Sequence, residues 1–100
     1  MMMLGERVPA ATALDWGMIW QVVADDALMT TAAAVVKRLA SGPTKTYALI
    51  RHGIRAALDS SLTDTLAVER RNQRAAGATA DFAEGVAAFL AKRPASFAGR

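Results

Sequence analysis

Two side chains near the C-terminal end have types and a spacing that suit a nucleotide ligand. Phe89 and Lys92 are three residues apart in a segment whose pattern predicts a helix, so both fall on one helical face. A flat apolar ring beside a mobile ammonium group can contact a base and a phosphate. The residues that precede this pair offer no evident catalytic group, so the pair by itself predicts binding rather than a reaction.

Nucleophilic catalysis finds no support in the sequence. His52 is the single histidine and lies between Arg51 and Arg55. A catalytic base needs a nucleophile and an orienting carboxylate that converge on it, and no spacing supplies them. We interpret His52 as a surface residue.

Paired carboxylates have a structural explanation in each case. Asp25 and Asp26 stand at a helix start, and Asp81 with Glu84 stand in a first helical turn, where acidic groups favour the helix dipole. Asp64 and Glu69 do not share a helical face, and the seven glycines form no phosphate-binding loop. The sequence therefore predicts no catalytic residue.

Cysteine is absent and histidine occurs once, so a structural zinc site is not expected. The lack of cysteine is compatible with a cytoplasmic protein. The apolar start is only four residues long before Gly5, Glu6 and Arg7, which is too short for a signal peptide. No run approaches the roughly 18 apolar residues of a membrane span, so we expect a soluble chain.

The net charge of +3 permits an anionic partner without requiring one. Basic groups fall in two clusters: Lys45, Arg51, His52 and Arg55, then Arg70, Arg71 and Arg74. They leave open an alternative function, an autonomous helical module that binds nucleic acid or an acidic partner. We do not favour nucleic acid, because acidic residues are interspersed and the aromatic residues lie elsewhere.

The elements that carry these side chains are predicted to be helices. Four helical patterns run over residues 27–40, about 43–58, 61–77 and 80–92. Asp26, Ser60 or Ser61, and Thr79 are the expected N-caps, and Gly42 and Gly77 are the expected ends, with Gly42 in a left-handed conformation. The connections are too short for other elements, so the chain is predicted to be all-α, with four to five helices.

Apolar residues recur at helical spacing and predict the buried faces. In the second and last helices the stripes are Tyr47, Ile50, Ile54 and Leu58, and Phe82, Val86, Phe89 and Leu90. Pro94 stops the last helix, and the tail after it is expected to be loose apart from Phe97.

The first 25 residues are less regular. A short helix from about Pro9 to Gly17 is followed by an apolar segment, residues 18–23. This extended segment is either a buried strand or a connector packed on the helices. A single strand has no partner within the chain, so its partner would be another copy or a separate stretch of polypeptide.

The order of these features resembles a known family. The segments LGERVPAATALDWGMIWQVV, LASGPTKTYALIR, SLTDTLAVERRNQ and AEGVAAFLAKRPASFAGR are similar to the C-terminal portion of the enoyl-CoA hydratase/isomerase (crotonase) superfamily. The resemblance covers essentially all 100 residues. The nearest subgroup is the isomerases of the phenylacetate pathway, which act on a ring-epoxidised phenylacetyl-CoA.

The resemblance implies a division of labour within a longer enzyme. An N-terminal β/α core would supply the oxyanion-binding N–H groups and the acidic residues, so this segment is expected to be inactive alone. Residues 1–25 would pack on that core, and residues 26–100 would form a helical trimerisation domain and the lip of the acyl-CoA site.

The resemblance also implies a ligand for the terminal pair. Phe89 and Lys92 match a Phe-x-x-Lys pattern that approaches the adenine and the 3′-phosphate of coenzyme A. The residues alone favour a simpler interpretation for the isolated chain, with Phe89 in the core and Lys92 in solvent, because two contacts hold a large ligand weakly. We therefore expect no cofactor on the isolated chain, and a coenzyme A thioester as the family's substrate.

The expected partner of the isolated chain is another copy of itself. Exposed Trp16 and Trp20, together with residues 18–23, would drive self-association into a dimer or trimer. No membrane partner is expected.

Overall fold

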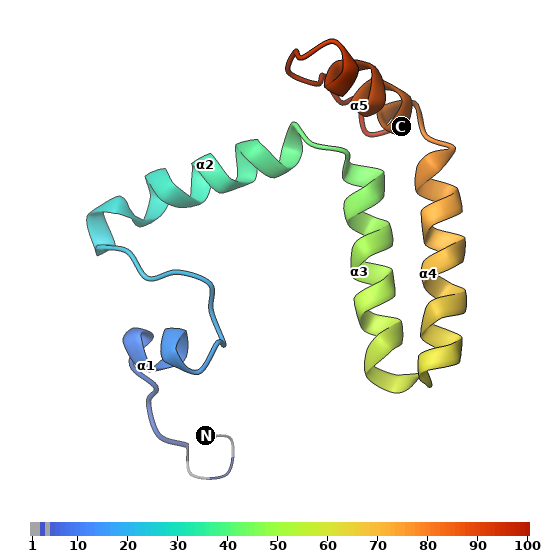
Figure 1. Ribbon diagram of the computed structural model, residues 1–100. Coiled ribbons are helices and arrows are strands. Elements are labelled where there is room, and N and C mark those ends of the chain that lie inside the picture. The colour runs from blue at the N-terminus through green and yellow to red at the C-terminus, as the bar shows by residue number, and fades with distance from the viewer. Residues whose placement is uncertain (1–2, 4) are drawn as a thin grey trace. The chain divides into compact units, whose positions relative to one another are not determined.

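The computed structural model describes Met3 and residues 5–100, and every regular element among them is a helix. The helices are α1 (Ala10–Asp15), a 3-10 helix (Asp25–Ala27), α2 (Leu28–Ala40), α3 (Thr44–Asp59), α4 (Leu62–Gly77) and α5 (Ala80–Leu90) (Figure 1). The prediction of an all-α chain is confirmed. The chain divides into two compact units, Met1–Ala34 and Val35–Arg100.

The first unit holds α1, the 3-10 helix and the start of α2. Residues 16–20 form a turn and bends, and residues 21–24 have no regular structure. The buried-strand interpretation of residues 18–23 is therefore wrong for this chain. A strand needs a neighbour to pair its backbone N–H and C=O groups, and the described part of the chain offers none.

Local capping signals confirm two of the predicted helix starts. Ser61 Oγ accepts the Asp64 N–H at 3.2 Å and donates to Asp64 Oδ2 at 2.7 Å. Thr79 Oγ1 accepts the Phe82 N–H at 3.1 Å. These short-range bonds satisfy first-turn N–H groups that have no partner within the helix.

Two predicted helix boundaries are wrong in detail. Asp26 lies inside the 3-10 helix that precedes α2 and does not cap it, because the chain already turns at Ala24. Gly42 is not left-handed. Glycine is required at this position because it has no side chain: a Cβ there would lie 2.0 Å from the hydroxyl oxygen of Tyr47. Gly42 therefore lets the Tyr47 ring cover the turn between α2 and α3.

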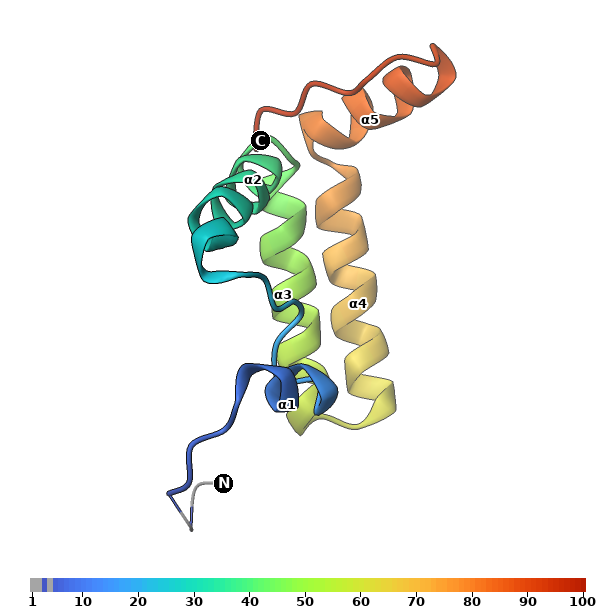
Figure 2. The same cartoon turned by 90° about the vertical axis from the view of Figure 1, so that its left-hand side faces the viewer.

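The second unit is built on an antiparallel pair, α3 and α4 (Figure 2). The side of α3 that faces α4 carries Leu49, His52 and Gly53. Asn72 of α4 donates its Nδ2–H to the Leu49 carbonyl oxygen at 3.0 Å, and its Oδ1 lies 3.2 Å from His52 Nδ1. Small and polar groups thus join the two helices.

The predicted apolar stripe of α3 adjoins this face, where Ile50 and Ile54 line the groove beside α4, but it is largely exposed. Ile50, Ile54 and Leu58 are 54%, 62% and 77% exposed. The stripe on α5 is also exposed, at 55% for Phe82, 45% for Val86, 71% for Phe89 and 74% for Leu90. The prediction that these residues point inward is wrong within this chain, where Ala88 is the one buried apolar residue among those described. Among the described residues, these apolar faces are therefore largely exposed.

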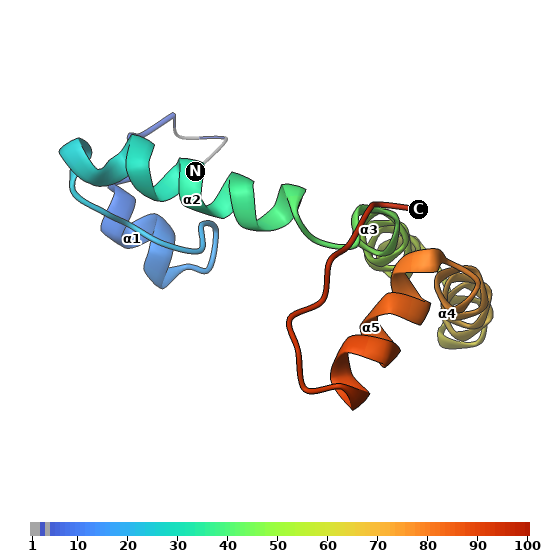
Figure 3. The ribbon, with the colours of Figure 1, turned by 90° about the horizontal axis from the view of Figure 1, so that it is seen from above.

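The C-terminal tail is ordered against α5. Figure 3 shows residues 93–100 leaving the end of α5 and returning towards the start of α3. The prediction of a loose tail is therefore wrong, and the contacts that hold the tail belong to the candidate site.

Candidate functional site

The two residues singled out by their spacing come together at the end of α5. Lys92 Nζ lies 4.7 Å from the centroid of the Phe89 ring. At this distance the ammonium is attracted to the negative face of the ring, by about 0.5–1 kcal/mol at an exposed site. Phe89 is 71% exposed, so the pair presents an aromatic surface and a cation together to solvent. The alternative of a core phenylalanine is wrong within this chain.

The backbone around Lys92 closes the helix in a defined way. The Lys92 N–H donates to the Phe89 carbonyl oxygen at 3.2 Å, and the Arg93 N–H donates to the Ala88 carbonyl oxygen at 3.1 Å. These two bonds are those of a Schellman motif, whose penultimate residue is left-handed. Lys92 has a φ of +53° and is the one non-glycine residue with positive φ among those described. The site thus contains a strained position.

Asp81, at the start of α5, is a buried carboxylate with 3% exposure. It accepts the Ala98 N–H at 2.7 Å and the Gly99 N–H at 2.9 Å. Its own N–H donates to the Arg100 carbonyl oxygen at 3.0 Å. The end of the tail therefore supplies partners to both the side chain and a first-turn N–H of α5.

Glu84, one turn further on, holds the beginning of the tail. Its two oxygens accept Arg93 Nη1–H at 2.6 Å and Arg93 Nη2–H at 2.8 Å, and Oε1 also accepts the Ser96 N–H at 2.8 Å. The bonds from Arg93 and from the Ser96 N–H lower the pKa of Glu84 from 4.5 to about 2. The same pair raises the pKa of Arg93. The carboxylate is thus ionised throughout the neutral range.

The name "tail clasp" denotes the two carboxylates, Asp81 and Glu84, together with the tail residues to which they are hydrogen-bonded. Between its two ends the Phe97 ring lies over Gly85, where a Cβ would be 3.6 Å from the ring. Gly99 has a φ of +73°, and a Cβ there would lie 2.6 Å from Thr44 Oγ1 at the start of α3. The tail therefore runs back along α5 and ends against α3.

Sequence reasoning assigned Asp81 and Glu84 only to the helix dipole and so missed the clasp. Their spacing of three residues on one face was a usable signal, because it aligns two acceptors along α5. The positions of their partners depend on the chain reversal at Lys92, which the pattern did not reveal.

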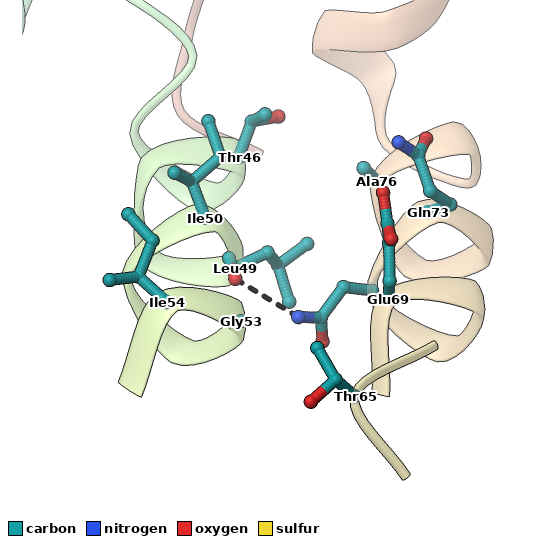
Figure 4. A pocket seen from close by; sticks show the side chains of 10 residues that line it. Thr46, Leu49, Ile50, Gly53, Ile54, Thr65, Glu69, Gln73 and Ala76 are labelled. Atoms are coloured by element: carbon teal, nitrogen blue, oxygen red, sulfur yellow. Dashed lines mark hydrogen bonds between the residues drawn. The ribbon is translucent and has the colours of Figure 1, made fainter. Parts of the chain in front are cut away.

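A groove lies along the α3–α4 pair, with a volume of about 340 Å³. Figure 4 shows Leu49 directed towards α4 and Ile54 directed away from it, with the bond from Asn72 to the Leu49 carbonyl drawn as a dashed line. The walls are largely apolar, with Thr65, Glu69 and Gln73 contributed by α4. Its polar groups do not converge on a point, so the groove fits a surface for packing better than a catalytic cleft.

The other polar candidates stay apart from this site. His52 contacts Asn72 rather than a nucleophile. Among the described residues, no three or more metal-binding side chains gather into a possible metal site. No described helix is long and apolar enough to cross a membrane.

Comparisons with known proteins match the whole chain. The profile of the family described as "Enoyl-CoA hydratase/isomerase" covers residues 1–100. The 1,2-epoxyphenylacetyl-CoA isomerase of Escherichia coli is 46% identical over 98 residues, which are 98% of this chain and 37% of that protein. A Rhodobacter capsulatus protein named "Probable enoyl-CoA hydratase" is 39% identical over 100 residues, which are 100% of this chain and 39% of that protein.

A solved structure has the same helical arrangement. The crystal structure of an enoyl-CoA hydratase subunit I from Geobacillus kaustophilus matches with a TM-score of 0.91 and 34% identity. The match covers 97% of this chain and 38% of that one. The chain thus spans less than two fifths of the length of these relatives.

Proposed function

Because the chain belongs to the enoyl-CoA hydratase/isomerase family, we propose that it serves as the C-terminal helical domain of such an enzyme. In this role it forms a lip of the acyl-CoA site and an oligomerisation surface, and it does not turn over substrate by itself. The matched relatives extend well beyond the matched region, which supports a part in a larger catalytic unit.

The observation that carries the proposal is the exposed pair of Phe89 and Lys92 at the end of α5. The 71% exposed ring can stack on the adenine of coenzyme A. The Lys92 ammonium, 4.7 Å from the ring centroid, is close enough to reach a phosphate attached to the same nucleoside. A base and a phosphate side by side are the two features that the pair recognises.

The substrate class follows from the relatives and is part of the proposal. A coenzyme A thioester is the substrate named for the Escherichia coli relative. The identity of 46% with that isomerase favours the phenylacetate-pathway subgroup. A cytoplasmic location fits this substrate and the absence of cysteine.

The exposed apolar faces support the oligomerisation role. The stripes on α3 and α5 have no cover in this chain, and removing them from water would stabilise an assembly by about 25 cal/mol per Å² of apolar area. We propose that residues 26–100 form the trimerisation and coenzyme A-lip domain. Residues 1–25 would pack on a separate β/α core, since Trp16 and Trp20 are 61% and 75% exposed.

Three of the nine carboxylates are held by contacts within the chain, which supports a non-catalytic role for these three in the chain alone. Asp81 and Glu84 are occupied by the tail, and Asp64 is bonded to Ser61. We therefore expect no hydration of crotonyl-CoA by the purified chain, measured by the loss of the ultraviolet absorbance of the conjugated enoyl thioester. Turnover proportional to protein concentration would contradict this part of the proposal.

A binding titration tests the ligand. Coenzyme A and dephospho-coenzyme A, which lacks the 3′-phosphate, are titrated into the chain and into Lys92→Met. Coenzyme A should bind about threefold to tenfold more tightly than dephospho-coenzyme A, because one exposed charge-assisted hydrogen bond distinguishes them. Lys92→Met should abolish that difference.

The matched control is Lys45→Met, which removes another exposed lysine, in α3. It should leave the ratio of the two affinities unchanged. A duplex DNA arm at two salt concentrations tests the alternative basic module. Steeply salt-dependent DNA binding, together with equal affinity for the two coenzymes, would support the module and contradict the proposal.

A further inference from the structure

The tail clasp joins two regions whose relative position matters for the proposed ligand contact. One is the strained residue Lys92, and the other is the face of α5 that carries Asp81 and Glu84. The chain reverses direction at Lys92. The side chain of the next residue, Arg93, therefore reaches Glu84, with its Nη1 atom 2.6 Å from Glu84 Oε1. A single left-handed residue produces this reversal.

The strain at Lys92 needs a compensating interaction. A non-glycine residue in the left-handed region is disfavoured by its Cβ, and glycine would close the helix without that penalty. The Schellman bonds alone leave the next residues free to fray, because they end at Arg93. The clasp adds contacts beyond that point, at Ser96, Ala98 and Gly99.

The anchors on α5 lie in its first half, at residues 81, 84 and 85. Glu84 holds residues 93 and 96, Phe97 covers Gly85, and Asp81 holds residues 98 and 99. With the tail fixed in this way, Lys92 has anchored chain on both sides. Its Cα–Cβ bond then has a fixed direction, and in this arrangement Nζ lies 4.7 Å from the centroid of the Phe89 ring.

We infer that Asp81 and Glu84 are positioning residues. By fastening residues 93–100 along α5, they keep Lys92 left-handed and its ammonium at the face of Phe89, and so preorganise the contact to the nucleotide end of the ligand. The last step rests on the proposed function, whereas the positioning of Lys92 does not. If a ligand binds only the ordered conformation, its apparent affinity is the intrinsic affinity multiplied by the fraction of molecules in that conformation. The affinity therefore falls as the ordered fraction falls.

The test uses Glu84→Gln and Asp81→Asn, each nearly isosteric. Glutamine places an N–H group against an Arg93 donor, and asparagine places one against the Ala98 or Gly99 N–H. The control is Glu69→Gln, which makes the same change of charge on the exposed surface of α4. This control matters because loss of a negative charge by itself favours an anionic ligand.

Two readouts are recorded by NMR on the full chain. The first is the upfield ring-current shift of the Lys92 side-chain protons above Phe89, with the Lys92 backbone coupling that reports φ. The second is the affinity for adenosine 3′,5′-bisphosphate. Both variants should lose at least half of the Lys92 ring-current shift and bind the bisphosphate about threefold to tenfold more weakly. Glu69→Gln should change neither readout.

The outcomes separate the two proposals. If Lys92 keeps its shift and φ in both variants, the inference is wrong, whatever the ligand does. If the shift is lost but the affinity is unchanged, preorganisation is overturned. If the wild-type chain binds no bisphosphate while both variants release Lys92, the proposed function fails and the positioning stands. Should Asp81→Asn lose helical circular dichroism, Glu84→Gln, at a surface site, decides the question.

Discussion

At the residue scale, Lys92 combines a strained backbone conformation with a side chain to which we assign a role in ligand binding. Its backbone performs a task suited to glycine, yet its side chain carries the cation that lies above Phe89. The inference runs from an observed strained residue to a role for its side chain.

The strain at Lys92 predicts that glycine at this position gives a more stable chain than alanine, the reverse of their usual order within a helix. Lys92→Gly and Lys92→Ala both remove the ammonium, but only alanine keeps the Cβ in the left-handed conformation. The glycine variant should therefore have the higher free energy of unfolding, by about 1 kcal/mol. Urea denaturation followed by circular dichroism measures the difference. An alanine variant as stable as the glycine variant would show that φ at this residue is not positive in solution.

The pKa of Glu84 predicts a second effect at this scale. Because folding lowers this pKa from 4.5 to about 2, the carboxylate stabilises the folded chain above pH 4.5. That contribution is lost as the pH falls from 4.5 to about 2. As the pH falls through this window, the melting temperature of the wild type should decrease more than that of Glu84→Gln. Thermal melts at several pH values test this, with Glu69→Gln as control, and identical pH profiles for wild type and Glu84→Gln would contradict it.

At the element scale, α3 and α4 are joined by polar and small groups rather than by their apolar stripes. Asn72 spans the pair, with bonds to Leu49 and His52, and Gly53 adjoins it, since a Cβ there would lie at an ordinary contact distance of 3.4 Å from Asn72 Nδ2. The apolar stripe of α3 is therefore largely exposed in the chain. A helix with two different contact faces is expected to mediate an assembly.

This arrangement predicts that Asn72→Ala destabilises the pair. It removes the bond to the Leu49 carbonyl oxygen, which is part-buried, at a cost of about 1 kcal/mol. Gln73→Ala, the neighbouring amide, is the control and should change the free energy of unfolding by less than about 0.5 kcal/mol. Chemical denaturation of both variants checks the difference. Equal effects would show that the bond from Asn72 does not hold the pair.

The whole molecule combines 53% hydrophobic residues with a single buried apolar residue among those described. Burial of apolar surface is the dominant favourable term in folding, yet most of the large apolar side chains of the described residues are exposed in the single chain. The described faces at Ile54, Leu58 and Phe89 are more than half exposed. These exposed apolar faces are the basis of the oligomerisation proposal.

Self-association is the corresponding prediction. Light scattering should give a mass that rises with concentration above the 10.6 kDa of one chain. Combining Ile54→Lys with Leu58→Lys should shift the chain towards a monomer, because two charges would have to leave water on association. Thr63→Lys, at an exposed polar residue of α4, should leave the mass unchanged. A wild-type chain that remains a monomer at millimolar concentration would contradict the proposal.

The sequence by itself determined the all-α class, the approximate extent of the helices and the caps at Ser61 and Thr79. It also determined the family and the candidate pair of Phe89 and Lys92. These depend on neighbours within about four residues or on the order of motifs, and both can be read along the chain. The start of α2 and the end of α5 were missed, by one and two residues respectively, because turn geometry shifted them.

Only the tertiary structure decided which faces are covered and what the carboxylates do. The bonds from Ala98 and Gly99 to Asp81 join residues 17 and 18 positions apart, and they exist only because the chain turns back at Lys92. The same holds for α3, where contacts with Asn72 and not hydrophobic periodicity selected the side that faces α4. A periodic pattern shows that a helix has an apolar face, but the partner of that face is fixed by contacts between distant residues.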